Sequence, residues 1–200
     1  LTDSRLLGAG GLAVLEADQG QKITERAELR DSERKRRIVI LGFYRVASSF
    51  LTELERRHAA LLEQVFVVDF NPTVYRELQT RGIRIHYGDI SHADTLTHAG
   101  IADAEIIISS VPDSLLKGTN NERLVRHVRS VNATAKIIAT ADVLGETETL
   151  YAAGADYVTI ARLDQANELV DVVAAAEAGL IDDMRSRLTE RLQDRGEILP

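Results

Sequence analysis

A glycine-led turn, Gly42-Phe43-Tyr44-Arg45-Val46-Ala47, is the first segment whose residue types and spacing could do chemistry. The spacing is that of the Gly-x-Gly-x-x-Gly/Ala fingerprint, in which a tight turn presents a helix N-terminus to a phosphate group. Gly42 occupies the first position and Ala47 the third, but Tyr44 stands at the second, where bare backbone usually approaches a pyrophosphate. We expect an anion-binding turn to which Arg45 adds charge, with Tyr44 blocking or redirecting the phosphate. The alternative is a simple tight turn with a solvated arginine.

Two carboxylates follow the next two apolar runs. Asp69 comes 22 residues after Ala47, near the spacing of about 20 residues at which an acidic side chain binds ribose hydroxyls. A carboxylate there accepts two hydrogen bonds from a cis-diol and repels a 2′-phosphate, which disfavours a ligand of the NADP type. Asp89, followed by Ile90, could accept a hydrogen bond from an adenine amino group. The alternatives are a helix cap for Asp69, although Asn71 is the better cap and leaves Asp69 freer, and a turn residue for Asp89.

Small side chains follow a later apolar run, where Ser109 and Ser110 would let a nucleotide lie across the sheet edge, unless the segment is a simple loop. No catalytic set accompanies them. The chain lacks cysteine, a Gly-x-Ser-x-Gly elbow, a Tyr-x-x-x-Lys pair and a P-loop lysine, and its five histidines have no zinc-site spacing. We therefore predict no catalytic residue and no metal site, and a nucleotide sensor rather than an enzyme.

Alternating apolar runs and helical patterns must position these residues. Runs buried on both faces and separated by helices indicate a parallel sheet, and ligands bind such a sheet beyond the carboxyl ends of its strands. We predict an α/β fold, a Rossmann-like doubly wound six-stranded parallel sheet over residues 38–162. The predicted strands are Ile38–Leu41, Val65–Val68, Arg84–Tyr87, Ile106–Ile108, Ile137–Ala139 and Tyr157–Ile160.

The segments on either side of the predicted sheet differ from it. Residues 1–37 are charged and are predicted to be a linker helix, either simply solvated or connecting to a membrane domain. Residues 163–200 are predicted to be a long C-terminal crossover helix that Gly179 kinks or divides. This helix either packs back on the sheet or contacts a second subunit. Its apolar face comprises Leu169, Val172, Val173, Ala176, Leu180, Ile181, Met184, Leu188 and Leu192.

Composition narrows the class of protein. The 200 residues are 44% hydrophobic and 28% charged, which suits a folded core and argues against disorder. The net charge of −7 gives no global basic surface, so no nucleic-acid partner is predicted. No apolar run reaches the roughly 20 residues needed to span a bilayer, and no signal peptide is indicated. Because the chain begins at Leu1 and its only methionine is Met184, we expect it to be part of a longer polypeptide.

Several segments, in the same order, resemble the TrkA-N or regulator-of-K⁺-conductance (RCK) domain, and most of all the C-terminal cytoplasmic domain of Kef-type cation/proton antiporters. The resemblance covers about residues 37–180. One departure is Tyr44, which replaces a glycine that the family usually has, so that a mononucleotide such as AMP fits better than a pyrophosphate ligand. The matching segments are residues 38–47, Val67–Asn71, Gly88–Ile90, Leu96–Ile101, Thr119–Asn121 and Leu150–Val158.

The resemblance implies a non-enzymatic domain that forms homodimers and binds AMP or NAD(H), with ADP and ATP as further candidates. It implies a site at the cytoplasmic face of the inner membrane, where ligand-dependent dimer rearrangement gates a membrane-embedded cation transporter in the same chain or an associated subunit. Gly42, Arg45 and Ala47 would face phosphate, Asp69 the ribose, Asp89 and Ile90 the adenine, and Ser109 and Ser110 the remaining rim. Phe43, Tyr44, Val46 and Phe70 complete the predicted nucleotide-binding set.

Two alternatives remain open at this point. The chain could be a fragment of an NAD-dependent oxidoreductase that has lost its catalytic domain. It could also be a nucleotide-free dimerisation module whose site is plugged by Tyr44. The fold by itself does not separate these functions.

Overall fold

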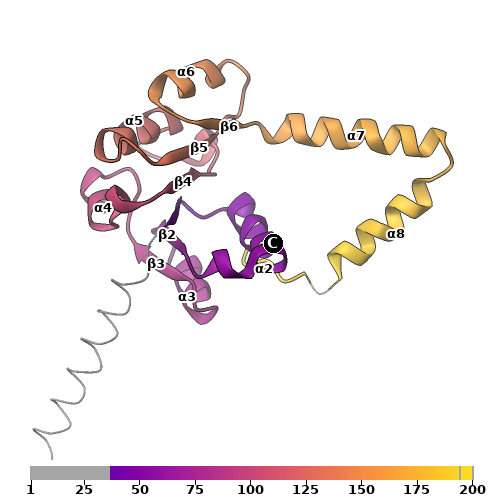
Figure 1. Ribbon diagram of the computed structural model, residues 1–200, viewed down its shortest axis with the longest axis horizontal. Coiled ribbons are helices and arrows are strands. Elements are labelled where there is room, and N and C mark those ends of the chain that lie inside the picture. Colours follow the sequence, from indigo (N-terminus) through magenta and orange to yellow (C-terminus); the bar gives the residue numbers. More distant parts are fainter. Residues whose placement is uncertain (1–36, 194, 200) are drawn as a thin grey trace, which may run out of the picture. The chain divides into compact units, whose positions relative to one another are not determined.

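The computed structural model describes residues 37–193 and 195–199 (Figure 1). The predicted linker helix over residues 1–37 lies outside this part of the chain except for its last residue, and it stays a prediction. Six parallel strands form one sheet in the order β3-β2-β1-β4-β5-β6, which confirms the predicted doubly wound fold. The strands are β1 (Ile38–Leu41), β2 (Val65–Asp69), β3 (Arg84–Tyr87), β4 (Ile106–Ser109), β5 (Lys136–Thr140) and β6 (Tyr157–Thr159).

The strand β1 lies in the centre of the sheet and pairs in parallel with β2 and β4. All four of its residues are apolar and buried, as expected for a strand covered on both faces. Ile38 lies opposite Val65 of β2 on one side and Ile106 of β4 on the other. The strand order therefore reverses at β1 and β4, and this reversal places the carboxyl ends of β1, β2 and β4 at the usual ligand edge.

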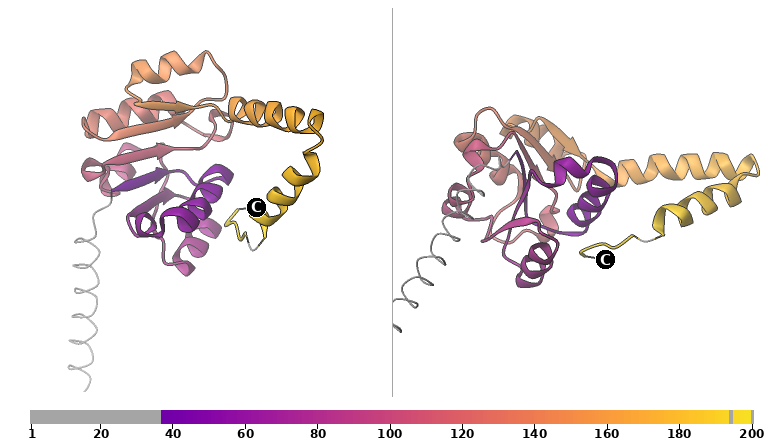
Figure 2. Two further views of the ribbon diagram at one scale, coloured as in Figure 1. Left: turned by 45° about the vertical axis from the view of Figure 1, so that its right-hand side comes forward. Right: turned by 60° about the horizontal axis from the view of Figure 1, so that its bottom comes forward.

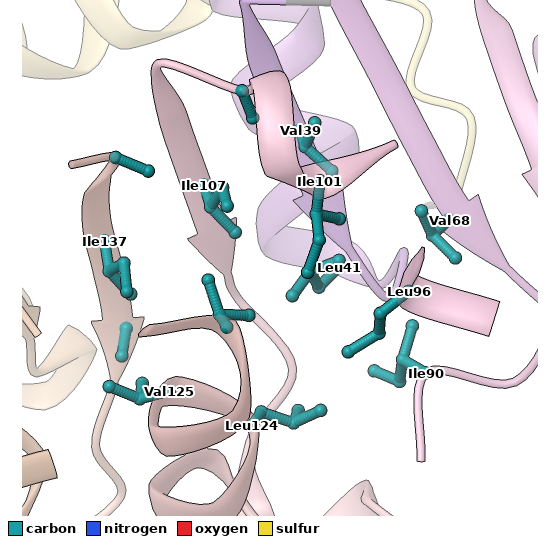
Figure 3. Packing of buried hydrophobic residues seen from close by; sticks show 14 of the residues in the cluster. Val39, Leu41, Val68, Ile90, Leu96, Ile101, Ile107, Leu124, Val125 and Ile137 are labelled. Atoms are coloured by element: carbon teal, nitrogen blue, oxygen red, sulfur yellow. The ribbon is translucent and has the colours of Figure 1, made fainter. Parts of the chain in front are cut away.

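Helices cover the two faces of the sheet and enclose two apolar clusters. On one face, helices α4 (Ala93–His98), α5 (Asn121–Val131) and α6 (Glu146–Ala153) pack on the strands. Figure 3 shows this cluster, in which Leu124 and Val125 of α5 meet the strand residues. Helices α2 (Arg45–Leu62) and α3 (Pro72–Thr80) enclose the second cluster on the other face.

The chain beyond β6 forms two helices, α7 (Ala161–Glu177) and α8 (Ile181–Leu192), which we call the α7–α8 arm. The division falls at Gly179, whose φ of +73° lies in the left-handed region that favours glycine. No residue of either helix is buried, so the arm does not pack back on the sheet, and Figure 2 shows α7 running away from it. Packing on a second subunit stays a prediction. No helix in the described part of the chain is both long and apolar enough to cross a bilayer.

Residues 195–199 form an extended segment instead of continuing the predicted helix. The segment returns to α2, where the backbone amides of Ile198 and Leu199 donate hydrogen bonds to Ser48 Oγ at 2.8 and 2.9 Å. The side chains of Ile198 and Leu199 pack against the second apolar cluster. The segment therefore ties the far end of the α7–α8 arm to the domain.

Candidate functional site

A cavity of about 430 Å³ lies at the carboxyl ends of β1 to β4. It sits at the point of strand-order reversal, where ligands bind open α/β sheets, and its size is that of a small-molecule site. Its walls are mostly apolar, with a few charged and polar groups. The lining residues are Gly42, Phe43 and Tyr44 after β1, Asp69, Phe70, Asn71 and Pro72 at β2, Asp89 and Ile90 after β3, and Val111, Leu115, Leu116, Lys117 and Thr119 after β4.

Gly42 is required by the geometry of the turn that closes the floor of the cavity. Its φ is +73°, and a Cβ at this position would lie 2.6 Å from Val111 Cγ2 and 3.1 Å from Ile90 Cδ1. Its backbone amide donates to the carbonyl oxygen of Val68 at 2.8 Å, which fixes the end of β1 against β2. The predicted tight turn is therefore present, and only glycine fits at its start.

Asp69 lines the cavity, and its carboxylate also binds the backbone of the turn that follows β1. Its Oδ2 accepts a hydrogen bond from the Phe43 amide at 2.7 Å, and its Oδ1 accepts one from the Asn71 amide at 2.6 Å. Burial raises the pKa of Asp69, and these two backbone hydrogen bonds partly oppose the shift. Asn71 caps α3 through a hydrogen bond from the Thr73 amide, as expected. Asp69 is less free than we expected, although each carboxylate oxygen retains capacity to accept from a ligand.

Asp89 combines the two roles considered for it. Its Oδ1 accepts a hydrogen bond from the Ser91 amide at 2.8 Å, as a turn residue does, and its Oδ2 lies 3.5 Å from His92 Nδ1. Its side chain is also part of the cavity wall, next to the buried Ile90. A turn residue in this position can still accept a hydrogen bond from a bound base.

Three residues of the predicted phosphate turn lie outside the cavity lining. Ala47 is buried in the cluster beneath α2, and Val46 is half exposed. The guanidinium carbon of Arg45 lies 5.8 Å from the centroid of the Tyr44 ring, in cation–π range. Tyr44 stands at the N-cap of α2 and lines the cavity. Obstruction of a phosphate by its ring stays a prediction.

The two predicted rim serines are also outside the lining. Ser109 Oγ donates to Asn121 Oδ1 at 2.6 Å, and Asn121 Nδ2 in turn donates to the carbonyl oxygen of Val111 and to Asp113. Ser109 therefore joins the end of β4 to α5 and is committed to the fold. Ser110 is buried, and its hydroxyl has no hydrogen-bond partner in the described part of the chain.

The loop between β4 and α5 supplies a wall that our sequence reasoning missed. It spans residues 110–120, which is longer than the two to six residues usual for such connections. Leu115 and Leu116 add apolar surface, and Lys117 adds the single positive charge among the described lining residues. The length of the loop and its paired leucines were the available signals.

Comparisons with known proteins identify the family of this chain. Residues 38–161 match the family model of the TrkA-N domain. The chain belongs to the TrkA-N domain family. This TrkA-N domain is 28% identical over 117 residues to the glutathione-regulated potassium-efflux system protein KefC of Cronobacter sakazakii. The match covers 58% of this chain and 18% of KefC, so the chain spans less than a fifth of that relative. The predicted resemblance to TrkA-N and Kef proteins is confirmed.

Solved structures of two relatives share the fold. The TrkA-N domain of the inner membrane protein YbaL from Escherichia coli superposes with a TM-score of 0.60 at 21% identity, covering 69% of this chain and 96% of that one. The structure of GsuK bound to ADP gives a TM-score of 0.52 at 27% identity, covering 63% of this chain and 31% of that one. The first likeness supports the fold of this TrkA-N domain alone.

Proposed function

We propose that this chain is the nucleotide-binding regulatory domain of a potassium or cation transport protein of Kef type, at the cytoplasmic face of the inner membrane. The observation that carries the proposal is the cavity at the strand-order reversal, with Asp69 and Asp89 on its walls. Membership of the TrkA-N family and the similarity to KefC support the link to potassium transport. The domain would have no catalysis of its own.

The chemistry of the cavity suits an adenine nucleotide. Asp69 offers carboxylate oxygens to ribose hydroxyls, and Asp89 offers one to the adenine amino group. Phe70 and Leu115 provide apolar surface for the base, and Lys117 can pair with a phosphate. GsuK, at 27% identity, has been solved with ADP, which supports the same ligand class here. Tyr44 is the N-cap residue of α2 and lines the cavity. We propose that its ring obstructs a second phosphate, so that AMP binds more tightly than ligands with a pyrophosphate.

Regulation requires that the ligand distinguish two arrangements of the protein, because a ligand shifts only an equilibrium whose states it binds differently. The α7–α8 arm is the element proposed to differ between them. Its large apolar side chains are about half exposed, including Leu169, Val173 and Leu188. Exposed apolar surface of this kind is typical of protein contacts. We propose that two copies of the chain pair through the arm and that nucleotide binding rearranges the pair.

Calorimetric titration of the 200-residue chain with AMP, ADP, ATP, NAD and NADH tests the proposal. Saturable binding is expected, with affinity reduced roughly tenfold in Asp69→Asn because a hydrogen bond to a charged acceptor is lost. Asp94→Asn is the matched control, because Asp94 is an exposed carboxylate on α4 away from the cavity. If none of the five nucleotides binds the folded chain, the proposal is wrong and a nucleotide-free dimerisation module is the better account.

A further inference from the structure

The extended segment 195–199 is attached to α2 by more than its contact with Ser48. Arg195 forms ion pairs with Glu53 of α2 and, at 2.7 Å, with Glu197 of its own segment. Ser49 Oγ donates to Glu197 at 2.8 Å. The Arg195 side chain is only 12% exposed. Its charge is therefore stabilised mainly by these two carboxylates. These polar and charged contacts align the segment along about one and a half turns of α2.

The same contacts explain how the α7–α8 arm is held. No residue of α7 or α8 is buried, so neither helix gains stability by packing on the sheet. The arm is joined to the domain through β6 at its start and through segment 195–199 at its end, and Arg56 of α2 also donates a hydrogen bond to the carbonyl oxygen of Arg191 in α8 at 3.3 Å. There the apolar side chains of Ile198 and Leu199 pack against the second cluster. Release of the segment would therefore remove the apolar and charged contacts at the far end of the arm and loosen it.

Ser48 joins this attachment to the cavity. Its backbone amide donates to the carbonyl oxygen of Tyr44 at 2.9 Å, the first hydrogen bond of α2. Its side chain is fully buried, and its hydroxyl oxygen accepts hydrogen bonds from the backbone amides of Ile198 and Leu199. Tyr44 lines the cavity. One residue thus contacts the cavity wall through its backbone and the segment through its side chain.

We propose that the face of α2 carrying Ser48, Ser49 and Glu53 is a docking surface for segment 195–199, and that docking is thermodynamically coupled to nucleotide occupancy through Ser48 and Tyr44. This inference rests on the proposed function, because it requires a nucleotide in the cavity. A bound nucleotide orders Tyr44 and the first turn of α2. The segment then docks on a turn that is already ordered, so docking loses less conformational entropy. Nucleotide binding therefore tightens docking, and loss of the nucleotide loosens the end of the arm.

Linkage makes the coupling reciprocal. If a nucleotide strengthens docking by some factor, then undocking the segment must weaken nucleotide affinity by the same factor. Arg195 offers a clean way to undock the segment, since it does not line the cavity. If substitution of Arg195 changes the nucleotide affinity, the effect must therefore be indirect, through the contacts between the segment and α2.

Hydrogen exchange measured on the 200-residue chain, with and without saturating ADP, is the first test. The amides of Ile198 and Leu199 are expected to exchange at least fivefold more slowly with ADP, the lower end of usual allosteric coupling. In Arg195→Ala both amides should exchange faster without any ligand. Unchanged exchange in this variant would show that α2 is not the docking surface.

Calorimetry with ADP and Arg195→Ala is the second test, with Arg185→Ala as the matched control. Arg185 is an exposed arginine of α8 whose ion pair is with Asp182 of the same helix. ADP affinity should fall at least fivefold in Arg195→Ala and stay unchanged in Arg185→Ala. Equal ADP affinity in wild type and Arg195→Ala would overturn the coupling while leaving the nucleotide site intact. Absence of binding by any of AMP, ADP, ATP, NAD and NADH in the wild type would overturn the proposed function and the coupling with it.

Discussion

The carboxylate of Asp69 accepts a hydrogen bond from the backbone amide of Phe43 at 2.7 Å. This hydrogen bond joins the end of β2 to the turn that follows β1. A second amide, that of Asn71, binds the other oxygen at 2.6 Å. The side chain that we propose to bind the ribose therefore also holds the shape of the cavity. The proposed ribose contact and the geometry of the turn therefore share one carboxylate.

This dependence predicts a pH effect on binding. Burial raises the pKa of Asp69 above its ordinary value of 3.8. Ribose hydroxyls donate to the ionised carboxylate, so affinity should be constant near neutral pH and fall as the pH drops through the raised pKa. Adenosine is the suitable ligand because it carries no titrating phosphate. Calorimetry at successive pH values should show this fall in the wild type and a flatter profile in Asp69→Asn.

Gly42→Ala should destabilise the domain by about 2–4 kcal/mol. The left-handed backbone at this position strains any other residue, and the added Cβ would overlap Val111. Chemical denaturation measures the free energy of unfolding. Gly145→Ala is the control, because its backbone is right-handed helical and a Cβ there meets nothing within 4 Å. Equal stability of the two variants would contradict the assigned role of Gly42.

Tyr44→Gly should change which nucleotide binds best. Removal of the ring exposes the first turn of α2, whose free amides favour phosphate groups. We expect affinity for ADP and NAD to rise relative to AMP, as measured by competition calorimetry. Tyr44→Phe keeps the ring and should keep the preference for AMP. If Tyr44→Gly leaves the order of affinities unchanged, the ring does not obstruct a pyrophosphate.

Lys117→Met should remove the preference for a charged ligand. The ammonium group is the one positive charge among the described lining residues, and its pairing with a phosphate is worth roughly tenfold in affinity. AMP should then bind no better than adenosine, whose own affinity should not change. Arg126→Met makes the same change in net charge on the outer face of α5, where Arg126 pairs with Glu122, and should have no effect. An unaltered ratio of AMP to adenosine affinity in Lys117→Met would place the phosphate elsewhere.

Leu169→Asp should separate the proposed dimer into monomers. The side chain is 57% exposed on α7, and a charge in the centre of an apolar contact is costly. Light scattering coupled to size exclusion gives the mass of the assembly. Gln165→Glu adds the same charge at another exposed position of α7 and should leave the mass unchanged. A wild-type chain that is monomeric at all concentrations would contradict pairing through the arm.

Local sequence pattern predicted most of the fold, because buried parallel strands read as short apolar runs and helices as periodic ones. It also placed Gly42, Asp69 and Asp89 at the cavity, since the carboxyl ends of parallel strands share one edge. It did not reveal that Ser109 would be bound to Asn121, because that contact depends on how α5 docks on β4.

The attachment of segment 195–199 was beyond sequence reasoning for a similar cause. Ser48 and Ile198 are 150 residues apart in the chain, and no periodicity links them. The same holds for Lys117, which sits in a loop whose path is set by tertiary contacts. What could not be predicted is therefore the long-range pairing of polar groups, and this pairing shapes much of the site.

The division at Gly179 has a mechanical consequence. With a rise of 1.5 Å per residue, the 17 residues of α7 form a rod of about 25 Å. The two helices contact each other, and while both ends of the arm are attached to the domain these contacts would limit bending at Gly179. If the contacts of segment 195–199 with α2 are released, α7 can rotate about its first residues. A rotation of about 10° would displace the far end of α7 by about 4 Å. In the proposed regulation, a small adjustment beside the cavity would therefore become a displacement of several ångströms at the surface where a second subunit is proposed to bind.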